Sequence, residues 1–190
     1  MARVVVVENA SGDASANRIR AWAAESGVSC GEGDSDWLVL LEAADNHGYA
    51  AGNNIGLGWI ADAGEASHVW LLNPDTLASP SALTEMLARM ADDPRIGTCG
   101  ALLCEMDESD VVQCFAGAGF HPWTARPFDL GKGVSSALSV DHAAVEQKLA
   151  YVMGACLLAS RAFLEAAGPM DELFFLYFEE GSCLAEGIFS

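Results

Sequence analysis

The feature that most constrains the fold is a short apolar run that stops abruptly at a proline. Residues 68–72 form the run, and Asn73-Pro74-Asp75 follows directly. An apolar run closed by turn residues is typical of a strand in a parallel sheet covered on both faces. Pro74 lacks the N–H that a sheet ladder needs, so the strand must end before it. Asp75 is therefore predicted at the carboxyl end of a strand, where open α/β sheets bind ligands and a carboxylate can hold a divalent cation.

Strands and helices are predicted to alternate along the rest of the chain. Further apolar runs, each read as a strand, occupy residues 4–7, 37–41, 96–103 and 150–159. Helices are predicted at residues 15–25, 53–60, 79–90 and 160–167, where apolar residues recur at helical spacing. Their apolar faces include Trp22, Ile55 and the pair Met86 and Met90, which is interpreted as core packing. Pro94 is expected to end the third helix, and Ser160 to cap the fourth. This order predicts an α/β fold with a doubly wound, mostly parallel sheet. The irregular stretch from about 105 to 140, rich in glycine and proline, is predicted to be a binding loop.

Composition narrows the range of partners. The chain has 190 residues, of which 52% are hydrophobic and 19% charged, enough for one folded domain. The formal net charge of -18 argues against nucleic acid, because phosphate neutralisation needs Lys and Arg. A phosphorylated small molecule stays compatible with this charge, because a bound cation can supply positive charge locally. Solubility or a salt-adapted host is the more ordinary explanation of the acidity.

Cysteine spacing and the absence of long apolar runs indicate a reduced, cytoplasmic protein. The six cysteines form no C-x-x-C pair and no Cys/His cluster with zinc spacing. They are therefore expected to be reduced thiols, mostly buried. No apolar run approaches the roughly 20 residues that span a bilayer. The first residues are too few for a signal peptide.

Polar residues follow several of the predicted strands and offer candidate binding groups. Glu8 and Asn9 are predicted at the carboxyl end of the first strand. For Asn9 and Asp13, helix capping and contact with a nucleotide base or ribose are about equally expected. The small and amide residues of segment 46–57 allow a close backbone approach, as a phosphate or sugar site or as a plain tight turn. This segment is neither G-x-G-x-x-G nor a Walker loop.

Two adjacent carboxylates, Glu179 and Glu180, follow a strongly apolar and aromatic run. Carboxylates in apolar surroundings tend to have raised pKa values, which suits a general base. An ordinary exposed acidic turn is an equally good interpretation of the local pattern.

Four ordered stretches together resemble a known family. They are residues 7–15 (VENASGDAS), 46–57 (NHGYAAGNNIGL), 71–76 (LLNPDT), and 153–158 with 170–180 (MGACLL and MDELFFLYFEE). The set resembles the family-2 inverting glycosyltransferases of the GT-A fold, in the rhamnosyltransferase-like branch. The resemblance implies a three-layer α/β/α fold. It also implies transfer of a sugar, with rhamnose a candidate, from a nucleotide-diphosphate donor to a saccharide or lipid-linked acceptor during cell-wall polysaccharide synthesis.

The resemblance also implies a role for each matching residue. Asp75 would hold Mg²⁺ or Mn²⁺ against the diphosphate, and Glu180, with Glu179 beside it, would be the catalytic base. The acceptor side would include Gly154 and Ala155. The nucleotide-sugar side would comprise Glu8, Asn9, Asp13, Asn46, Gly48, Gly52, Asn53 and Asn73. Residues 1–103 would form the nucleotide-sugar-binding half of a single domain, and residues 104–190 its acceptor-side half.

The same comparison predicts a chain shortened at both ends. The family begins with one more strand and helix than this sequence has before residue 4, and it continues with helices after the Glu-Glu pair. An inactive fragment that only binds nucleotide or a partner chain is therefore the alternative. A sheet edge left open in this way would favour a homo-oligomer. A nucleotidyltransferase would need a Gly-rich basic loop that the sequence lacks. The expected location is the cytoplasm, with the inner face of the membrane as a peripheral site.

Overall fold

The structure, a computed structural model, describes residues 2–31, 33, 36–124 and 126–173. It is a mixed α/β fold with several small open sheets. The described residues divide into two compact units, one of residues 2–66 with 168–173 and one of residues 67–167. Each unit has its own sheet and helices.

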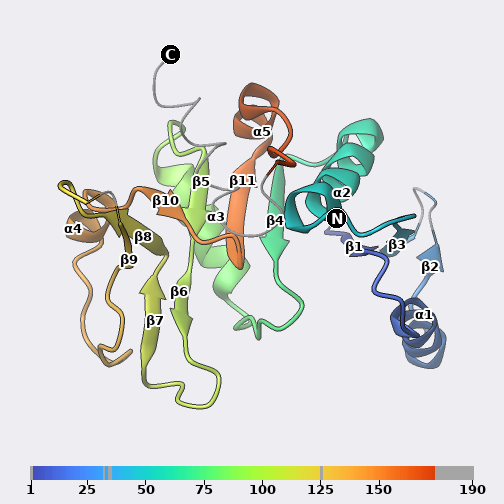
Figure 1. Cartoon of the computed structure of the whole chain (residues 1–190), viewed down its shortest axis with the longest axis horizontal. Helices are drawn as coiled ribbons and strands as arrows, with labels where there is room; N and C mark the ends of the chain where they lie inside the picture. The colour runs from blue at the N-terminus through green and yellow to red at the C-terminus, as the bar shows by residue number, and fades with distance from the viewer. Residues whose placement is uncertain (1, 32, 34–35, 125, 174–190) are drawn as a thin grey trace. The chain divides into compact units, whose positions relative to one another are not determined.

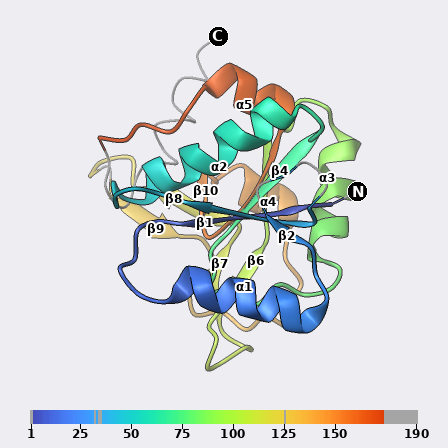
Figure 2. The same cartoon turned by 90° about the vertical axis from the view of Figure 1, so that its right-hand side faces the viewer.

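The first unit contains a three-stranded parallel sheet. Its strands are β1 (Val4–Glu8), β3 (Leu38–Glu42) and β2 (Cys30–Gly31), in the order β1-β3-β2. Helices α1 (Ser15–Ser26) and α2 (Tyr49–Ala63) lie on opposite faces of this sheet (Figures 1 and 2). The central strand is fully covered, with Val39 0% exposed, whereas Val4 on the outer strand β1 is 39% exposed. The predicted strands at 4–7 and 37–41 are confirmed, and here the predicted parallel pairing holds.

Helix α2 differs from its prediction in both its start and its packed face. It begins at Tyr49 rather than near Asn53, and its buried residues are Ala50, Ala51, Gly52 and Gly56. Ile55, predicted to face the core, is 40% exposed. A Cβ at Gly56 would lie only 3.2 Å from Cγ2 of Val7 in β1. The helix backbone packs close to the strand, so small residues rather than large apolar ones form the contact.

Helix α1 begins at the predicted residue and ends one residue later, at Ser26. Gly27 then closes it in the left-handed region, with φ +66°, which glycine adopts without steric cost. Its buried residues are Ala16 and Ala23, whereas Trp22 is 51% exposed. The predicted use of Trp22 as a core residue is therefore wrong, and small side chains again form the packed surface.

The main sheet of the second unit is antiparallel. Strand β11 (Cys156–Ser160) lies between β4 (His68–Leu72) and β5 (Thr98–Gly100), and both pairings are antiparallel. The prediction of a mostly parallel sheet is therefore wrong for this unit. An apolar run shows that a strand is covered, but the connections decide its direction. Strands β4 and β5, joined through helix α3 (Ala82–Asp92), run parallel to each other on either side of β11.

Helix α3 packs as predicted. Met86 and Met90 are 4% and 5% exposed, and they form a core cluster with Cys156 and Leu158 of β11. The helix ends at Asp92, before the predicted breaker at Pro94. The methionine face is therefore confirmed as core packing.

The stretch from 105 to 140 is not one irregular loop. Strands β6 (Leu102–Cys104) and β7 (Val112–Phe115) form an antiparallel pair. A second antiparallel sheet has the order β10-β8-β9, with β8 (Gly117–Phe120), β9 (Pro127–Asp129) and β10 (Tyr151–Val152). Two of the glycines that suggested a loop, Gly117 and Gly119, lie within β8, where a Cβ at Gly117 would collide with the backbone of Tyr151. Close strand approach, not chain flexibility, explains that glycine.

Two of the predicted strands are each divided in the structure. Residues 96–103 contribute β5 and the start of β6, and residues 150–159 contribute β10 and most of β11. The Gly154-Ala155 pair forms the turn between β10 and β11 instead of a point inside one strand.

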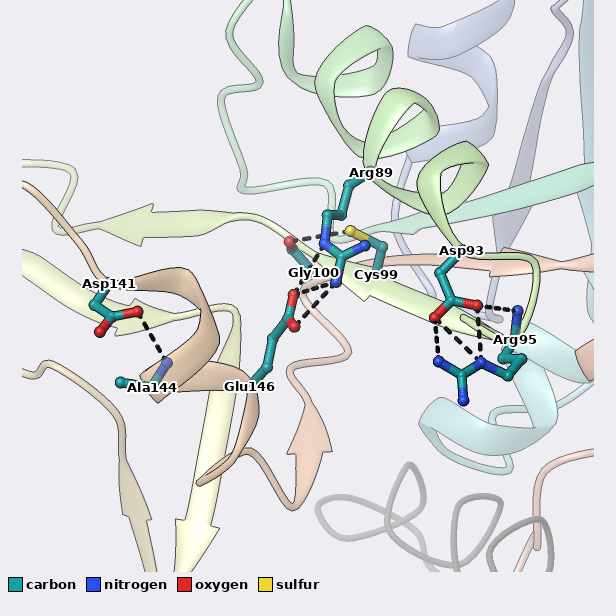
Figure 3. A network of polar contacts seen from close by, with 8 residues as sticks. All are labelled: Arg89, Asp93, Arg95, Cys99, Gly100, Asp141, Ala144 and Glu146. Atoms are coloured by element: carbon teal, nitrogen blue, oxygen red, sulfur yellow. Dashed lines mark hydrogen bonds and ion pairs between the residues drawn. The ribbon is translucent and has the colours of Figure 1, made fainter.

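Two short helices complete the second unit. A fork from Arg89 of α3 joins α4 (His142–Glu146), with Arg89 Nε and Nη2 donating to Glu146 Oε1 at 2.9 and 2.8 Å (Figure 3). Asp141 caps α4 by accepting from the Ala144 N–H at 3.2 Å (Figure 3). Helix α5 (Arg161–Ala167) is capped by Ser160 Oγ, which accepts from the Phe163 N–H at 3.2 Å, as the sequence predicts.

Cys114 and Cys156 are buried, but the other three described cysteines, Cys30, Cys99 and Cys104, are only half-buried, so the expectation that most thiols are buried is wrong for the described residues. The five described cysteines are free, and burial raises the pKa of the Cys114 thiol to about 12. Within the described part of the chain, no helix is long and apolar enough to cross a membrane.

Leu158→Ala should destabilise the protein strongly. Leu158 of β11 is 1% exposed and packs against α3, so truncation leaves a cavity as well as losing apolar contact, at a cost of about 2–5 kcal/mol. Urea unfolding followed by circular dichroism measures this change. The control is Leu77→Ala, at a side chain 85% exposed, which should change stability by less than about 0.5 kcal/mol. Equal losses in the two variants would contradict this core assignment.

Candidate functional site

In the first unit, Asn9 joins the end of β1 to the start of α2. It follows the last residue of the strand, and its Nδ2 donates to the Gly48 carbonyl at 2.9 Å and to Asn46 Oδ1 at 3.3 Å. Asn46 Oδ1 also accepts from the Gly48 N–H at 3.0 Å. Three of the predicted nucleotide-side residues are thus brought into one hydrogen-bonded cluster, which we call the amide cluster (Asn9, Asn46 and Gly48).

Two glycines allow the amide cluster to form. Gly48 precedes α2 with φ +94°, a backbone conformation that side chains with a Cβ rarely adopt. At Gly52, one turn into the helix, a Cβ would lie 3.1 Å from Asn9 Nδ2 and 3.2 Å from its Cγ. The amide of Asn9 therefore occupies space that any larger residue at position 52 would compete for.

The other oxygen of this cluster, Asn9 Oδ1, is buried and has no hydrogen-bond partner among the described residues. Leaving a buried acceptor unsatisfied costs about 1–3 kcal/mol, so such groups in native proteins call for a specific explanation. An N–H or O–H donor from a ligand would remove this cost. The amide cluster therefore combines fixed geometry with an unpartnered acceptor, which a ligand donor would reach once the atoms that cover it move aside.

Glu8 and Asp13 have local partners instead. Glu8 accepts from the Ser11 N–H at 2.7 Å, and hydrogen bonds from the Ser11 side chain and then from its N–H lower the pKa of the Glu8 carboxyl. Asp13 accepts from the Ser15 N–H at 2.7 Å and pairs with Arg18 at 3.2 Å. These contacts, the Ser15 bond above all, lower the pKa of Asp13 and place its carboxylate at the start of α1. For Asp13, helix capping explains the contacts, and a nucleotide contact stays a prediction.

The adjacent asparagines of α2 have different partners. Asn53, a predicted site residue, donates to the Tyr49 carbonyl at 2.9 Å within the same helix. Asn54, which the sequence did not single out, reaches the main chain of Met170 far along the chain. The only sequence signal for this contact was the presence of a second polar residue inside a largely apolar helix.

In the second unit, the Asn73-Pro74-Asp75 turn lies beside the Gly154-Ala155 turn. Strand β4 ends at Leu72, as predicted, and the Asn73 N–H then donates to the Ala155 carbonyl at 3.0 Å. The Thr76 N–H donates to the Asn73 carbonyl at 3.0 Å, which closes the turn. Asp75 is exposed on it. The predicted metal-binding carboxylate and the predicted acceptor-side residues are therefore neighbours.

Asp75 belongs to no cluster of metal-ligating side chains in the part of the chain that the structure describes. No group of three or more His, Cys, Asp or Glu side chains within the described ranges could hold an ion. Magnesium is commonly held by one or two carboxylates together with substrate phosphates and water. A lone exposed carboxylate suits an ion that arrives with a diphosphate, and does not suit an ion held entirely by the protein.

The predicted base lies outside the described residues, because Glu179 and Glu180 belong to segment 174–190. Glu8, Asp13 and Asn53 have local partners, and the other predicted residues form two groups, one in each unit. Asn9, Asn46, Gly48 and Gly52 come together in the first unit, and Asn73, Asp75, Gly154 and Ala155 in the second.

Comparison with known proteins points to a class of enzyme. No family model matches the chain. The chain is 27% identical over 186 residues to a low-salt glycan biosynthesis hexosyltransferase, Agl10, of Haloferax volcanii. The match covers 95% of this chain and 51% of the relative, so the chain spans about half the length of that enzyme. This distant similarity supports a glycosyltransferase at the level of class.

Gly52→Ala and Gly58→Ala should have opposite effects on stability. Both lie in α2, where alanine ordinarily stabilises a helix over glycine by roughly 0.5–1 kcal/mol. A Cβ at Gly58 meets nothing within 4 Å, so Gly58→Ala should gain that amount. At Gly52 a Cβ would lie 3.1 Å from Asn9 Nδ2, so the amide must shift by a few tenths of an ångström; its hydrogen bonds weaken, and Gly52→Ala should lose stability. Urea unfolding compares the two, and equal stabilisation would show that Asn9 is not held against Gly52.

Proposed function

We propose that this chain is the donor-binding and catalytic part of an inverting glycosyltransferase of family 2, with a GT-A-type nucleotide site. It would transfer a hexose, with rhamnose a candidate, from a nucleotide-diphosphate sugar to a saccharide or lipid-linked acceptor. The observation that carries the proposal is the amide cluster with the unpartnered Asn9 Oδ1 at the carboxyl end of parallel strand β1. The similarity to a hexosyltransferase supports the same class of reaction.

The amide cluster suits recognition of a base or ribose. Asn9 Oδ1 can accept from an N–H of a uracil or thymine ring or from a ribose hydroxyl, and its own Nδ2 is fixed by Gly48 and Asn46. A fixed acceptor binds without losing side-chain freedom at that moment. Parallel strands with their ligands at the carboxyl edge are the usual setting for such a site.

The second unit would supply the diphosphate and acceptor side. Asp75 would hold Mg²⁺ or Mn²⁺, and that ion, when bound, would offset negative charge on the leaving diphosphate. Gly154 and Ala155 present small side chains beside this turn, which leaves room for a sugar ring. Their bond to Asn73 would keep the acceptor side in register with Asp75.

Proton removal is assigned to Glu180, with Glu179 beside it. Glu180 would take the proton from an acceptor hydroxyl as the hydroxyl oxygen bonds to the anomeric carbon and the diphosphate leaves. Attack from the face opposite the leaving group inverts that carbon. General-base assistance of this kind is worth roughly 10²–10⁴-fold in rate.

A domain that binds the nucleotide without transferring sugar is the second candidate. It rests on the amide cluster alone, which offers contacts to a nucleotide without a catalytic group. Both candidates predict nucleotide binding, and only the first predicts transfer. A location in the cytoplasm, or at the inner face of a membrane where lipid-linked acceptors are found, belongs to the first.

Binding and transfer assays with UDP- and dTDP-sugars and Mn²⁺ should separate these candidates. Asp75→Asn should weaken the Mn²⁺-dependent part of donor binding, because the ion loses its carboxylate ligand. Glu180→Gln should keep donor binding and lower transfer by about 10²-fold or more, because the base is removed. Isothermal titration measures binding, and released UDP or dTDP measures turnover.

Asp62→Asn is the control, since Asp62 is exposed in the last turn of α2, at the opposite end of that helix from the amide cluster. It should bind and transfer as the parent does. Binding without transfer in the parent chain would favour the second candidate. No binding of any UDP- or dTDP-sugar would eliminate both.

A further inference from the structure

Two aromatic side chains meet on one face of the β10-β8-β9 sheet, whose strands are labelled in Figure 1. The rings of Phe120 in β8 and Tyr151 in β10 have centroids 5.7 Å apart and are tilted by 43°. Tyr151 lies opposite Ala118, two residues before Phe120, so the two rings are diagonal neighbours on the same face. Phe120 is 43% exposed, which leaves part of its ring accessible to a ligand. We call these two rings the aromatic pair.

The same face of the sheet carries a carboxylate and an ammonium group. Asp129 of β9 also lies opposite Ala118, on the other side of β8 from Tyr151. Lys132 Nζ donates to Asp129 Oδ2 at 3.0 Å, and the two side chains are 66% and 30% exposed, respectively. A carboxylate only accepts hydrogen bonds and an ammonium group only donates them. The ion pair therefore offers both kinds of group beside the aromatic pair.

Charge around the aromatic pair differs from that of the chain as a whole. The sequence contains 27 Asp and Glu residues and 9 Lys and Arg residues. Residues 111–140, however, include one carboxylate, Asp129, and two cations, Arg126 and Lys132. Because Asp129 is paired with Lys132, no strong field of one sign favours an ionic ligand here. The face suits an uncharged ligand that has both apolar and hydrogen-bonding groups.

A saccharide has this chemistry. The face of an aromatic ring carries partial negative charge, which attracts the C–H groups on one side of a pyranose ring. Sugar hydroxyls both donate and accept, so they match the ammonium group and the carboxylate together. An alkyl chain would cover the ion pair without replacing its hydrogen bonds to water, which costs free energy. A free phosphate would bind the ammonium group but gain nothing from the rings.

Strand β10 connects the aromatic pair to the proposed acceptor side within the second unit. Tyr151 precedes Gly154 by three residues, which span at most about 11 Å of extended chain. The Ala155 carbonyl then accepts from the Asn73 N–H, beside Asp75. A short run of linked sugar rings can therefore reach from the Gly154-Ala155 turn to the aromatic pair.

We propose that this sheet face is a saccharide subsite formed by Phe120, Tyr151, Asp129 and Lys132. It binds a sugar ring of the acceptor other than the ring that receives the transferred sugar. This inference rests on the proposed function and names its acceptor class: a chain of pyranose rings, free or lipid-linked, rather than a bare lipid. The subsite binds and orients the acceptor and takes no part in bond breaking. Its loss should therefore weaken acceptor binding and leave donor binding unchanged.

Saccharide binding in the absence of nucleotide tests the subsite without the transfer reaction. Labelled protein is applied to an array of uncharged pyranose mono-, di- and trisaccharides, and isothermal titration then measures the Kd of the trisaccharide that binds best. Phe120→Ala should bind this trisaccharide about tenfold more weakly than the parent, whereas Phe120→Tyr, which keeps the ring, should stay within about threefold. The Kd should be the same in about 0.1 M and about 1 M NaCl, because salt does not screen the binding of an uncharged ligand.

Two further variants separate the subsite from general damage. Trp22→Ala is the matched control, since it removes a ring that is 51% exposed on helix α1 of the first unit, and it should bind as the parent does. Lys132→Ala removes an exposed side chain and its hydrogen-bond donors, so it should weaken binding of the same trisaccharide even if Phe120→Ala does not fold. In transfer assays, Phe120→Ala should raise the KM for the trisaccharide about tenfold and keep the KM for the donor within about twofold of the parent.

The outcomes distinguish the subsite from the proposed function. A parent chain that binds no saccharide, or equal binding by the parent and Phe120→Ala, would overturn the subsite and leave donor binding and transfer to be judged separately. An oligomer that Phe120→Ala dissociates, seen by analytical ultracentrifugation, would instead assign this face to contact between copies of the chain and would also overturn the subsite. Saccharide binding that depends on Phe120 in a chain that binds no UDP- or dTDP-sugar would refute the proposed function, and the acceptor role of the subsite with it.

Discussion

The proposed nucleotide site depends on how closely helix α2 packs against strand β1. Cβ atoms at Gly52 and Gly56 would lie 3.1 Å from Asn9 Nδ2 and 3.2 Å from Val7 Cγ2, so hydrogen in place of a side chain is what permits this separation. The short separation lets Asn9 reach Gly48 and Asn46 with one amide group. It also leaves Asn9 Oδ1 covered, with no partner among the described residues. A helix with larger residues on this face would stand further off and separate these groups.

In the second unit, two turns rather than a helix bring the proposed site residues together. Its antiparallel strand β11 follows directly from the Gly154-Ala155 turn, and pairing with β4 brings that turn beside Asn73. The pairing of β4 with β11 fixes the position of the turn that carries the exposed Asp75. Packing of Leu158 of β11 against α3 stabilises this pairing. Backbone hydrogen bonds therefore place the groups proposed for the diphosphate and the acceptor. The Asp75 carboxylate is the side-chain group that the Asn73-Pro74-Asp75 turn adds to these backbone contacts.

The sequence predicted where elements lie better than how they pair and which faces they bury. Strand β4 ends before Pro74 because proline cannot donate, and such local causes are readable from sequence. The exposure of Trp22 and Ile55 could not be predicted from the sequence. Their helices bury alanine and glycine instead, which depends on neighbouring segments that the local pattern does not show. Gly117 suggested a loop but lies in a strand, because the backbone of Tyr151 lies too close to leave room for a Cβ. Strand direction in the second unit likewise depends on pairing across the chain.

Among the candidate site residues, too, those with local partners were predicted and one with a distant partner was missed. Asn9, Asn46, Gly48 and Gly52 were predicted together and do come together, because all follow strand ends or start a helix. Asn54 was missed because its partner, Met170, is distant in sequence.

The central claim is that the amide cluster binds a nucleotide, and an NMR titration of labelled protein with UDP and with dTDP tests it most directly. The claim predicts that the Asn9 side-chain amide and the Gly48 N–H shift together and saturate, whereas shifts confined to other residues, or none, would contradict it.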